Sequence, residues 1–308
     1  MRILSVLALL PGCGESDSSA IDGGVAVVDG GVAVVDADVG DARPTFDAAQ
    51  PRDLAYEVTV SDPDGRLPDA VDSLVACAEG GLAEWARYVG GAGTLTVEIR
   101  VTDTEAGRFA GASTSNIAVG ACENTAPPCT LVEEQAIHRL RTGLDNPAMV
   151  GAPDVRIDVA PPYWTDEVWV DPAPLVRSAA VPGDRLDCVS LFTHELGHAL
   201  GMTGFRSLTT FEPTIEFQSL YDDHVRVGAE TLTFEGPLTV GEFGAVPLTR
   251  TSTTQNVYHY GDASTPSAID DLLMNGIVYE YGMRYFVRRL DARIVQDLGV
   301  PVLVLPTE

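Results

Sequence analysis

The sequence predicts an α+β fold in which strands and helices mix ahead of a shorter C-terminal part. Two patterns support this prediction. Apolar and polar residues alternate in TLTVEIRVTD at 94–103, as in a half-buried strand, and further short strands are expected near residues 116, 155 and 167. Apolar residues at helical spacing predict helices over 69–89, 131–142 and 288–301, and Gly299 and Pro301 end the last of these.

Length and charge narrow the classes of function. The 308 residues are enough for a domain with a sizeable buried core, and the composition becomes globular from about residue 52, which predicts one folded domain over 52–308. The chain has 45 acidic and 19 basic residues, a formal net charge of −26. Because such a charge repels phosphates and anionic headgroups, we expect the domain to bind neither nucleic acid nor an anionic membrane surface.

The N-terminus has the features of an export signal. The apolar run in MRILSVLALLPG at 1–12 follows an early arginine and is too short to span a bilayer. The stretch LPGC at 10–13 resembles a bacterial lipobox, which implies cleavage before Cys13 and a lipid attached to it. Residues 13–51 contain GGVAVVD twice in tandem and predict a flexible acidic linker. We therefore expect a lipoprotein anchored to the cell envelope or outer surface; the alternative is an ordinary secretory signal with an incidental cysteine.

The remaining cysteines predict two disulfides. Cys77, Cys122, Cys129 and Cys188 are an even number in a chain that is expected to enter an oxidising compartment. Cys122 and Cys129 bracket a turn-rich stretch and are the expected partners, which leaves Cys77 to pair with Cys188. Four free buried thiols are the alternative.

The stretch HELGHALGM at 194–202 places His194 and His198 four residues apart, with Glu195 beside the first. Residues at this spacing on a helix lie about 5 to 6 Å apart between their Cβ atoms, so two imidazoles can bind one zinc ion. Glu195 can then act as a general base that takes a proton from water and passes it to a leaving amine. Asp187 is the predicted N-cap of this helix.

The motif HExxH followed by Gly201 resembles the metzincin clan of zinc endopeptidases, in which the glycine lets the chain turn so that a third histidine can approach. The short metzincin motif has that histidine six residues after the second one, and this position is Gly204 here. His138 lies upstream on a predicted helix and is read as a surface residue. His224 follows two aspartates and fits a solvated turn equally well.

The order of HExxHxxG, a long insertion, a lone histidine, DLLMNG and a closing helix resembles the leishmanolysin family over roughly residues 187–300. The resemblance implies that zinc is bound by His194, His198 and His259, the last being the third ligand. It also implies that Glu195 is the catalytic base and that Met274 is the methionine of the turn beneath the metal, the Met-turn.

The resemblance further implies a metzincin-like zincin fold. In such a fold a mixed twisted sheet and the active-site helix form an upper subdomain, here to about residue 203. A smaller, irregular or helical lower subdomain covers about 204–308. The expected activity is hydrolysis of peptide bonds in a protein or peptide substrate.

Two alternatives remain open at this point. In a thermolysin-like arrangement a glutamate is the third ligand, and the available candidates are Glu212, Glu216, Glu230 and Glu235. That arrangement leaves Gly201 and DLLMNG without a role. The other alternative is a non-catalytic surface lipoprotein for binding or adhesion, with a structural zinc site. Glu195 would be superfluous there, because structural sites close with four protein ligands. Calcium is a further candidate ion at Asp262, Asp270 and Asp271, which turn formation explains equally well.

Overall fold

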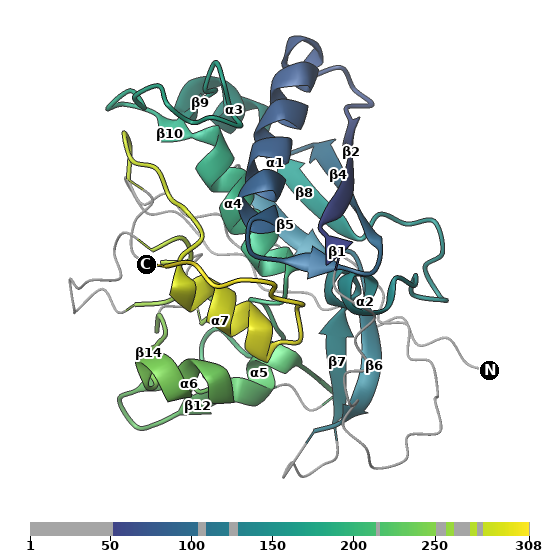
Figure 1. Ribbon diagram of the computed structural model, residues 1–308, viewed down its shortest axis with the longest axis vertical. Coiled ribbons are helices and arrows are strands. Elements are labelled where there is room, and N and C mark those ends of the chain that lie inside the picture. The colour runs from purple at the N-terminus through teal and green to yellow at the C-terminus, as the bar shows by residue number, and fades with distance from the viewer. Residues whose placement is uncertain are drawn as a thin grey trace.

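The computed structural model of the protein describes residues 52–103, 109–122, 129–213, 216–250, 257–261, 272–275 and 280–307. The expected signal and linker, over 1–12 and 13–51, lie outside the described residues. So do the three aspartates considered as calcium ligands. Helices and several small sheets share the described part of the chain, so the α+β class is confirmed (Figure 1).

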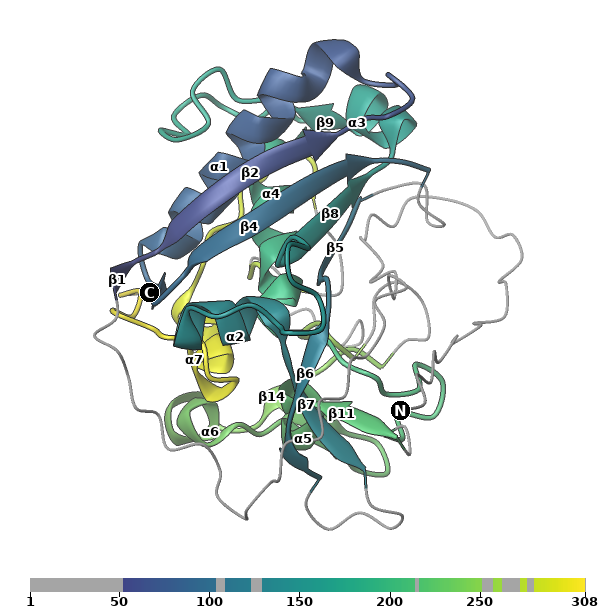
Figure 2. The same cartoon turned by 90° about the vertical axis from the view of Figure 1, so that its right-hand side faces the viewer.

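The largest sheet contains four strands in the order β2 (Ala55–Ser61), β4 (Thr94–Val101), β8 (Val155–Val159) and β5 (Phe109–Ser113). The first three are parallel, and β5 runs antiparallel to β8, so the sheet is mixed (Figure 2). Burial alternates along β4, as its sequence pattern predicts. Among the described strands β5 is at one edge of this sheet.

Helices α1 (Val71–Ala86) and α4 (Cys188–Ala199) pack against each other on one face of this sheet (Figure 2). The indole Nε1 of Trp85 on α1 donates a hydrogen bond to the carbonyl oxygen of Thr193 on α4, at 2.9 Å. The expected Cys77–Cys188 disulfide joins the same two helices, with the Cα atoms 5.7 Å apart. The metal-motif helix is therefore fixed to the core from its first residue.

A three-stranded sheet, seen below the large one in Figure 2, contains β6 (Asn116–Ala121), β7 (Thr130–Glu134) and β11 (Phe217–Ser219). The prediction of one helix over 131–142 is wrong in its first part, because Thr130–Glu134 form β7 between β6 and β11. Helix α2 (Gln135–Thr142) begins only after Glu134, whose backbone is extended. The second expected disulfide, Cys122–Cys129, joins the ends of β6 and β7.

The stretch before the motif helix contains a helix that the sequence patterns did not predict. The strand expected near residue 167 has only two residues, β9 (Val168–Trp169), because α3 (Pro161–Glu167) precedes it and begins with two prolines. β9 pairs with β10 (Leu186–Asp187), which leads directly into α4. Two short strands, β1 (Arg52–Asp53) and β3 (Gly90–Gly91), and the 3-10 turn Pro68–Ala70 complete the N-terminal part.

The chain after α4 forms smaller and less regular structure. Its elements after β11 are α5 (Leu220–His224), β12 (Val225–Val227), β13 (Leu232–Phe234), α6 (Pro237–Phe243), β14 (Val246–Pro247) and α7 (Arg289–Asp297). Helix α7 ends near Gly299, whose φ of +95° explains why a glycine stands there. The boundary expected near residue 203 stays a prediction, and the pairing of β7 with β11 crosses it. Among the described residues, no helix combines the length and the apolar character that crossing a membrane requires.

Candidate metal centre

Helix α4 positions His194, Glu195 and His198. The predicted N-cap is confirmed, because the Asp187 carboxylate accepts the backbone N–H of Ser190 at 3.1 Å. The guanidinium of Arg177, itself buried, donates to the same carboxylate at 2.8 Å. Every residue of α4 is buried, so other parts of the chain cover the face that carries the histidines as well as the core face.

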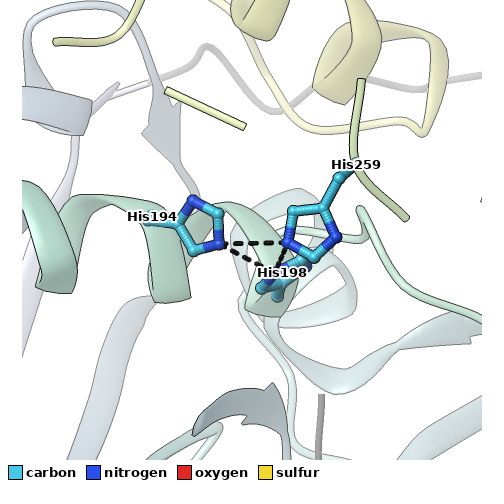
Figure 3. A group of neighbouring side chains, drawn as sticks. All are labelled: His194, His198 and His259. Carbon is cyan, nitrogen blue, oxygen red and sulfur yellow. Dashed lines mark hydrogen bonds between the residues drawn. The ribbon is translucent and has the colours of Figure 1, made fainter. Parts of the chain in front are cut away.

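The structure brings His194, His198 and His259 together. Their Nε2 atoms form a triangle in which each pair is 3.2 Å apart, and all three side chains are buried (Figure 3). Figure 3 shows two rings extending from one helix and the third entering from a separate segment. Among the described residues, these are the only three His, Cys, Asp or Glu side chains that are grouped closely enough to hold one metal ion.

Two of the rings are oriented by backbone carbonyls. His194 Nδ1 lies 2.8 Å from the carbonyl oxygen of Leu273, and His198 Nδ1 lies 2.8 Å from that of Met202. Since a carbonyl oxygen can only accept, each Nδ1 carries the proton and each neutral ring has its lone pair on Nε2. The lone pairs of His194 and His198 thus face one point, where they repel unless a cation lies between them.

Burial keeps these rings neutral. It lowers the pKa of His194 from 6.5 to about 4, and the hydrogen bond to Leu273 opposes this only in part. Burial and the neighbouring His194 lower the pKa of His198 to about 3. Neutral imidazole is the form that binds metals, so the site is prepared for an ion at neutral pH without having to lose protons.

His259 is held in place by hydrogen bonds of its own backbone and of the next residue, Tyr260. Its carbonyl oxygen accepts the N–H of Thr249 at 3.0 Å, and the N–H of the next residue, Tyr260, donates to Met274 O at 2.8 Å. The Tyr260 hydroxyl donates to Asp291 of α7 at 2.6 Å. The third histidine is therefore tied both to the turn around Met274 and to the C-terminal helix.

Met274 lies against the helix that carries the first two histidines. A Cβ added at Gly197, between His194 and His198 on α4, would be only 2.6 Å from the Met274 sulfur. Leu272 O accepts the N–H of Asn275 at 3.2 Å, so the chain turns tightly around Met274. The role of Met274 as the methionine of a Met-turn stays a prediction.

The two glycines after the motif have different structural roles. Gly201 has a φ of +106°, and a Cβ there would lie 2.8 Å from Ile137, so the sharp turn expected after the motif does require glycine. At Gly204, where the short metzincin motif has its histidine, a Cβ would lie 2.5 Å from Cγ of the buried Asp222. Asp222 accepts the N–H of Phe205 at 2.8 Å and occupies the space that a side chain at 204 would need.

The other candidate ligands lie outside the group of three histidines. His138 on α2 contacts Glu133 at 2.8 Å, and the ring of His224 on α5 packs edge-on against Phe234. None of the four glutamates considered as third ligands belongs to the group, and three of them are exposed: Glu212, Glu216 and Glu230. The geometry therefore favours histidine over glutamate at the third position.

Glu195 is fully buried beside the histidines. Burial raises the pKa of its carboxyl group from 4.5 to about 8, and a hydrogen bond from the backbone N–H of Gly111 on β5 opposes the rise. Its Oε2 atom has no hydrogen-bond partner among the described residues, so Oε1 is the atom that accepts from Gly111. Sequence reasoning missed Gly111, although a glycine inside a strand often marks a close backbone approach.

A second group of residues that sequence reasoning missed supports the segment leading to His259. The buried Arg206 donates to the carbonyl oxygen of Asp222 at 2.7 Å, and its backbone N–H donates to the hydroxyl of Tyr258 at 2.7 Å. These contacts join the loop after α4 to the residue before the third histidine. No sequence motif indicates them, because the three residues are far apart in the chain.

Comparisons with known proteins add no assignment. A scan against protein-family models, a search of curated proteins and a search of solved structures each found no match to this chain. What the structure establishes about this centre is that three buried histidines, two from α4 and one from the segment 257–261, lie close enough to bind one metal ion.

Proposed function

We propose that the protein is a zinc-dependent endopeptidase. The observation that carries the proposal is the convergence of three buried imidazoles, with one buried carboxyl group, Glu195, adjacent in the chain to the first of them. The fold class, the histidine geometry and the place of Met274 support a metzincin of leishmanolysin type, with the zinc ligands His194, His198 and His259.

The donor set fits zinc. Imidazole nitrogens bind zinc at about 2.0 to 2.1 Å, and two such nitrogens in a tetrahedral site are then about 3.3 to 3.4 Å apart. The three Nε2 atoms are separated by 3.2 Å, close to that value. Structural zinc sites usually have four protein ligands, whereas catalytic sites have three and an open position. The group of three histidines therefore favours a catalytic role.

Glu195 is the proposed general base. When bound, zinc would lower the pKa of a water molecule and polarise the scissile carbonyl group. A cation beside Glu195 also favours its ionised form, which offsets the effect of burial on its pKa. Gly111 holds Oε1, and Oε2 is left to take the proton of the attacking water and to deliver it to the departing amine nitrogen.

The substrate class and the location are part of the same proposal. A water-activating carboxylate next to a three-histidine site suits hydrolysis of the peptide bonds of a protein or peptide. Export and attachment through a lipid at Cys13 rest on the N-terminal sequence. The competing function, a surface lipoprotein that uses the metal only for structure, gives the buried Glu195 no role.

The decisive experiment compares the native protein with Glu195→Gln in a casein-cleavage assay after zinc loading. We expect Glu195→Gln to retain one zinc per chain and to lose activity by about 100-fold or more, because it loses the proton acceptor but keeps the histidines. Glu212→Gln, at an exposed glutamate, is the matched control and should cleave like the native protein. Equal cleavage by native protein and Glu195→Gln, or no cleavage by either when zinc is bound, would reject the proposal.

A further inference from the structure

The backbone of the edge strand β5 contacts the proposed general base directly. β5 pairs with β8 with Gly111 opposite Ile157, and it is at the edge of its sheet among the described strands. In an antiparallel pair, the residues alternate between those bonded to the partner strand and those whose N–H points outward. The N–H of Gly111 bonds to the side chain of Glu195, so it is one of the N–H groups that point away from β8.

Only glycine fits at this point. A Cβ at position 111 would clash with the Cβ of Glu195 and would lie 2.9 Å from the carbonyl oxygen and 3.0 Å from the Cα of the same residue. These atoms belong to the backbone of α4 or are attached directly to it. They cannot move aside as the end of a flexible side chain can, so any larger residue has to push β5 and α4 apart.

The contact distinguishes the two oxygens of the Glu195 carboxyl group. Oε1 accepts from Gly111, and Oε2 has no hydrogen-bond partner among the described residues. A buried carboxyl group with one oxygen fixed and the other available has a defined orientation. A general base needs such an orientation, because a displacement of about 1 Å can cost about 100-fold in rate.

We propose that Gly111 is a positioning residue for Glu195: its N–H fixes one carboxylate oxygen, and its missing side chain lets α4 approach close enough for that bond. The catalytic consequence rests on the proposed peptidase function. The contact itself does not, and it can be measured in a protein with no activity.

The first test measures the contact. The Gly111 amide is followed by hydrogen exchange in protein labelled with ¹⁵N and ¹³C, in which its signal is assigned by triple-resonance NMR without the use of a Gly111 variant. We expect this amide to exchange slowly in the native protein and in Glu195→Gln, which keeps an acceptor oxygen, and at least about tenfold faster in Glu195→Ala. Equal exchange in the native protein and in Glu195→Ala would overturn the proposal.

The second test measures the consequence for catalysis. Gly111→Ala should keep one zinc per chain and a KM near the native value, while kcat falls by about 100-fold because the base is displaced. Gly93→Ala is the matched control: a Cβ there would lie 2.9 Å from the Cα of Gly143 and 3.0 Å from the carbonyl oxygen of Arg139 on α2, a comparable clash with backbone away from the metal centre, so it should lower stability without lowering kcat. Gly120→Ala, with no atom within 4 Å of the added Cβ, controls for the loss of glycine itself.

The outcomes separate the two proposals. A folded, zinc-loaded Gly111→Ala with kcat within twofold of native overturns the positioning role, and so does a loss of kcat that matches the loss of zinc. If Gly111→Ala does not fold, the exchange rates in native protein, Glu195→Gln and Glu195→Ala decide the matter alone. A native protein that binds zinc and protects the Gly111 amide but cleaves no peptide rejects the proposed function and supports the contact.

Discussion

At the scale of single residues, burial sets the protonation states of the side chains at the candidate metal centre. His194 and His198 are neutral because burial disfavours their protonated forms, and burial likewise favours the neutral form of Glu195 in the metal-free protein. A bound dication would favour the ionised form of Glu195 and would be coordinated by the lone pairs of the histidines. Burial therefore makes the metal-free arrangement of these groups energetically unfavourable. For the same reason, the site favours a positive ion.

The stability of the metal-free protein should report the pKa of Glu195. This pKa is raised from 4.5 to about 8, so the contribution of Glu195 to stability is complete below about 4.5 and is lost as the pH rises through about 8. Gln has no proton to lose. Glu195→Gln should therefore match the native protein near pH 4 and exceed it at pH 9 by on the order of 3 to 5 kcal/mol. Urea unfolding at both pH values measures this, and a pH-independent difference would contradict it.

At the scale of elements, the core holds α4 more firmly than the loops around it. Trp85, the Cys77–Cys188 disulfide and the Asp187 N-cap all act on this one helix. Two histidines therefore have a rigid base, while the third depends on the segment 257–261 and on contacts with Met274 and α7.

The two disulfides should differ in their effect on stability. Cys77 and Cys188 are 111 residues apart in sequence, and Cys122 and Cys129 are only 7 apart. Loop-closure entropy predicts that Cys77→Ala with Cys188→Ala lowers the free energy of unfolding by about 5 kcal/mol, and that Cys122→Ala with Cys129→Ala lowers it by about 2.5 kcal/mol. Denaturant unfolding of the two double variants tests this. A larger loss from the shorter loop would show that loop entropy does not dominate.

Sequence patterns predicted the elements that are determined by residues close together in the sequence. The helical spacing and the N-cap Asp187 identify α4, and the spacing within it brings His194 and His198 together. Patterns failed where distant partners decide the structure: residues 131–134 form a strand because β6 and β11 lie on either side of them. The bond from Gly111 to Glu195 could not be predicted for the same reason, since it joins two elements that are far apart in the chain.

The third histidine lies between these two cases. Its choice followed from a family resemblance and from the small number of histidines, since no local pattern places residue 259 near residue 198. The structure brings His259 Nε2 to 3.2 Å from both of the other rings. The contacts that hold it there, from Arg206 and Tyr258 to Tyr260 and Asp291, had no signature in the sequence.

At the scale of the whole molecule, the metal centre joins the core to the smaller C-terminal part. His194 and His198 belong to α4, which packs on the large sheet, and His259 belongs to the segment that contacts α7. An ion bound by all three would act as a cross-link between these parts. Zinc binding and global stability should therefore be coupled.

Zinc should raise the unfolding temperature of the protein, and His259→Ala should remove most of this effect. At free zinc about 1,000-fold above its Kd, the expected stabilisation is about 4 kcal/mol. His138→Ala, at a histidine outside the group of three, should behave like the native protein in the same calorimetric scan with and without chelator. Full zinc content and an unchanged zinc-dependent shift in His259→Ala would remove residue 259 from the coordination sphere.

The close contact between Gly204 and Asp222 limits how this protein could be shortened. A shortened variant would delete the long segment that ends at His259 and would supply the third imidazole at position 204 instead. A side chain at position 204 would have to displace the buried carboxylate of Asp222, which accepts the N–H of Phe205. The backbone carbonyl oxygen of Asp222 also accepts a hydrogen bond from Arg206. The short metzincin motif, with its third histidine at position 204, is therefore incompatible with this fold unless position 222 is redesigned at the same time.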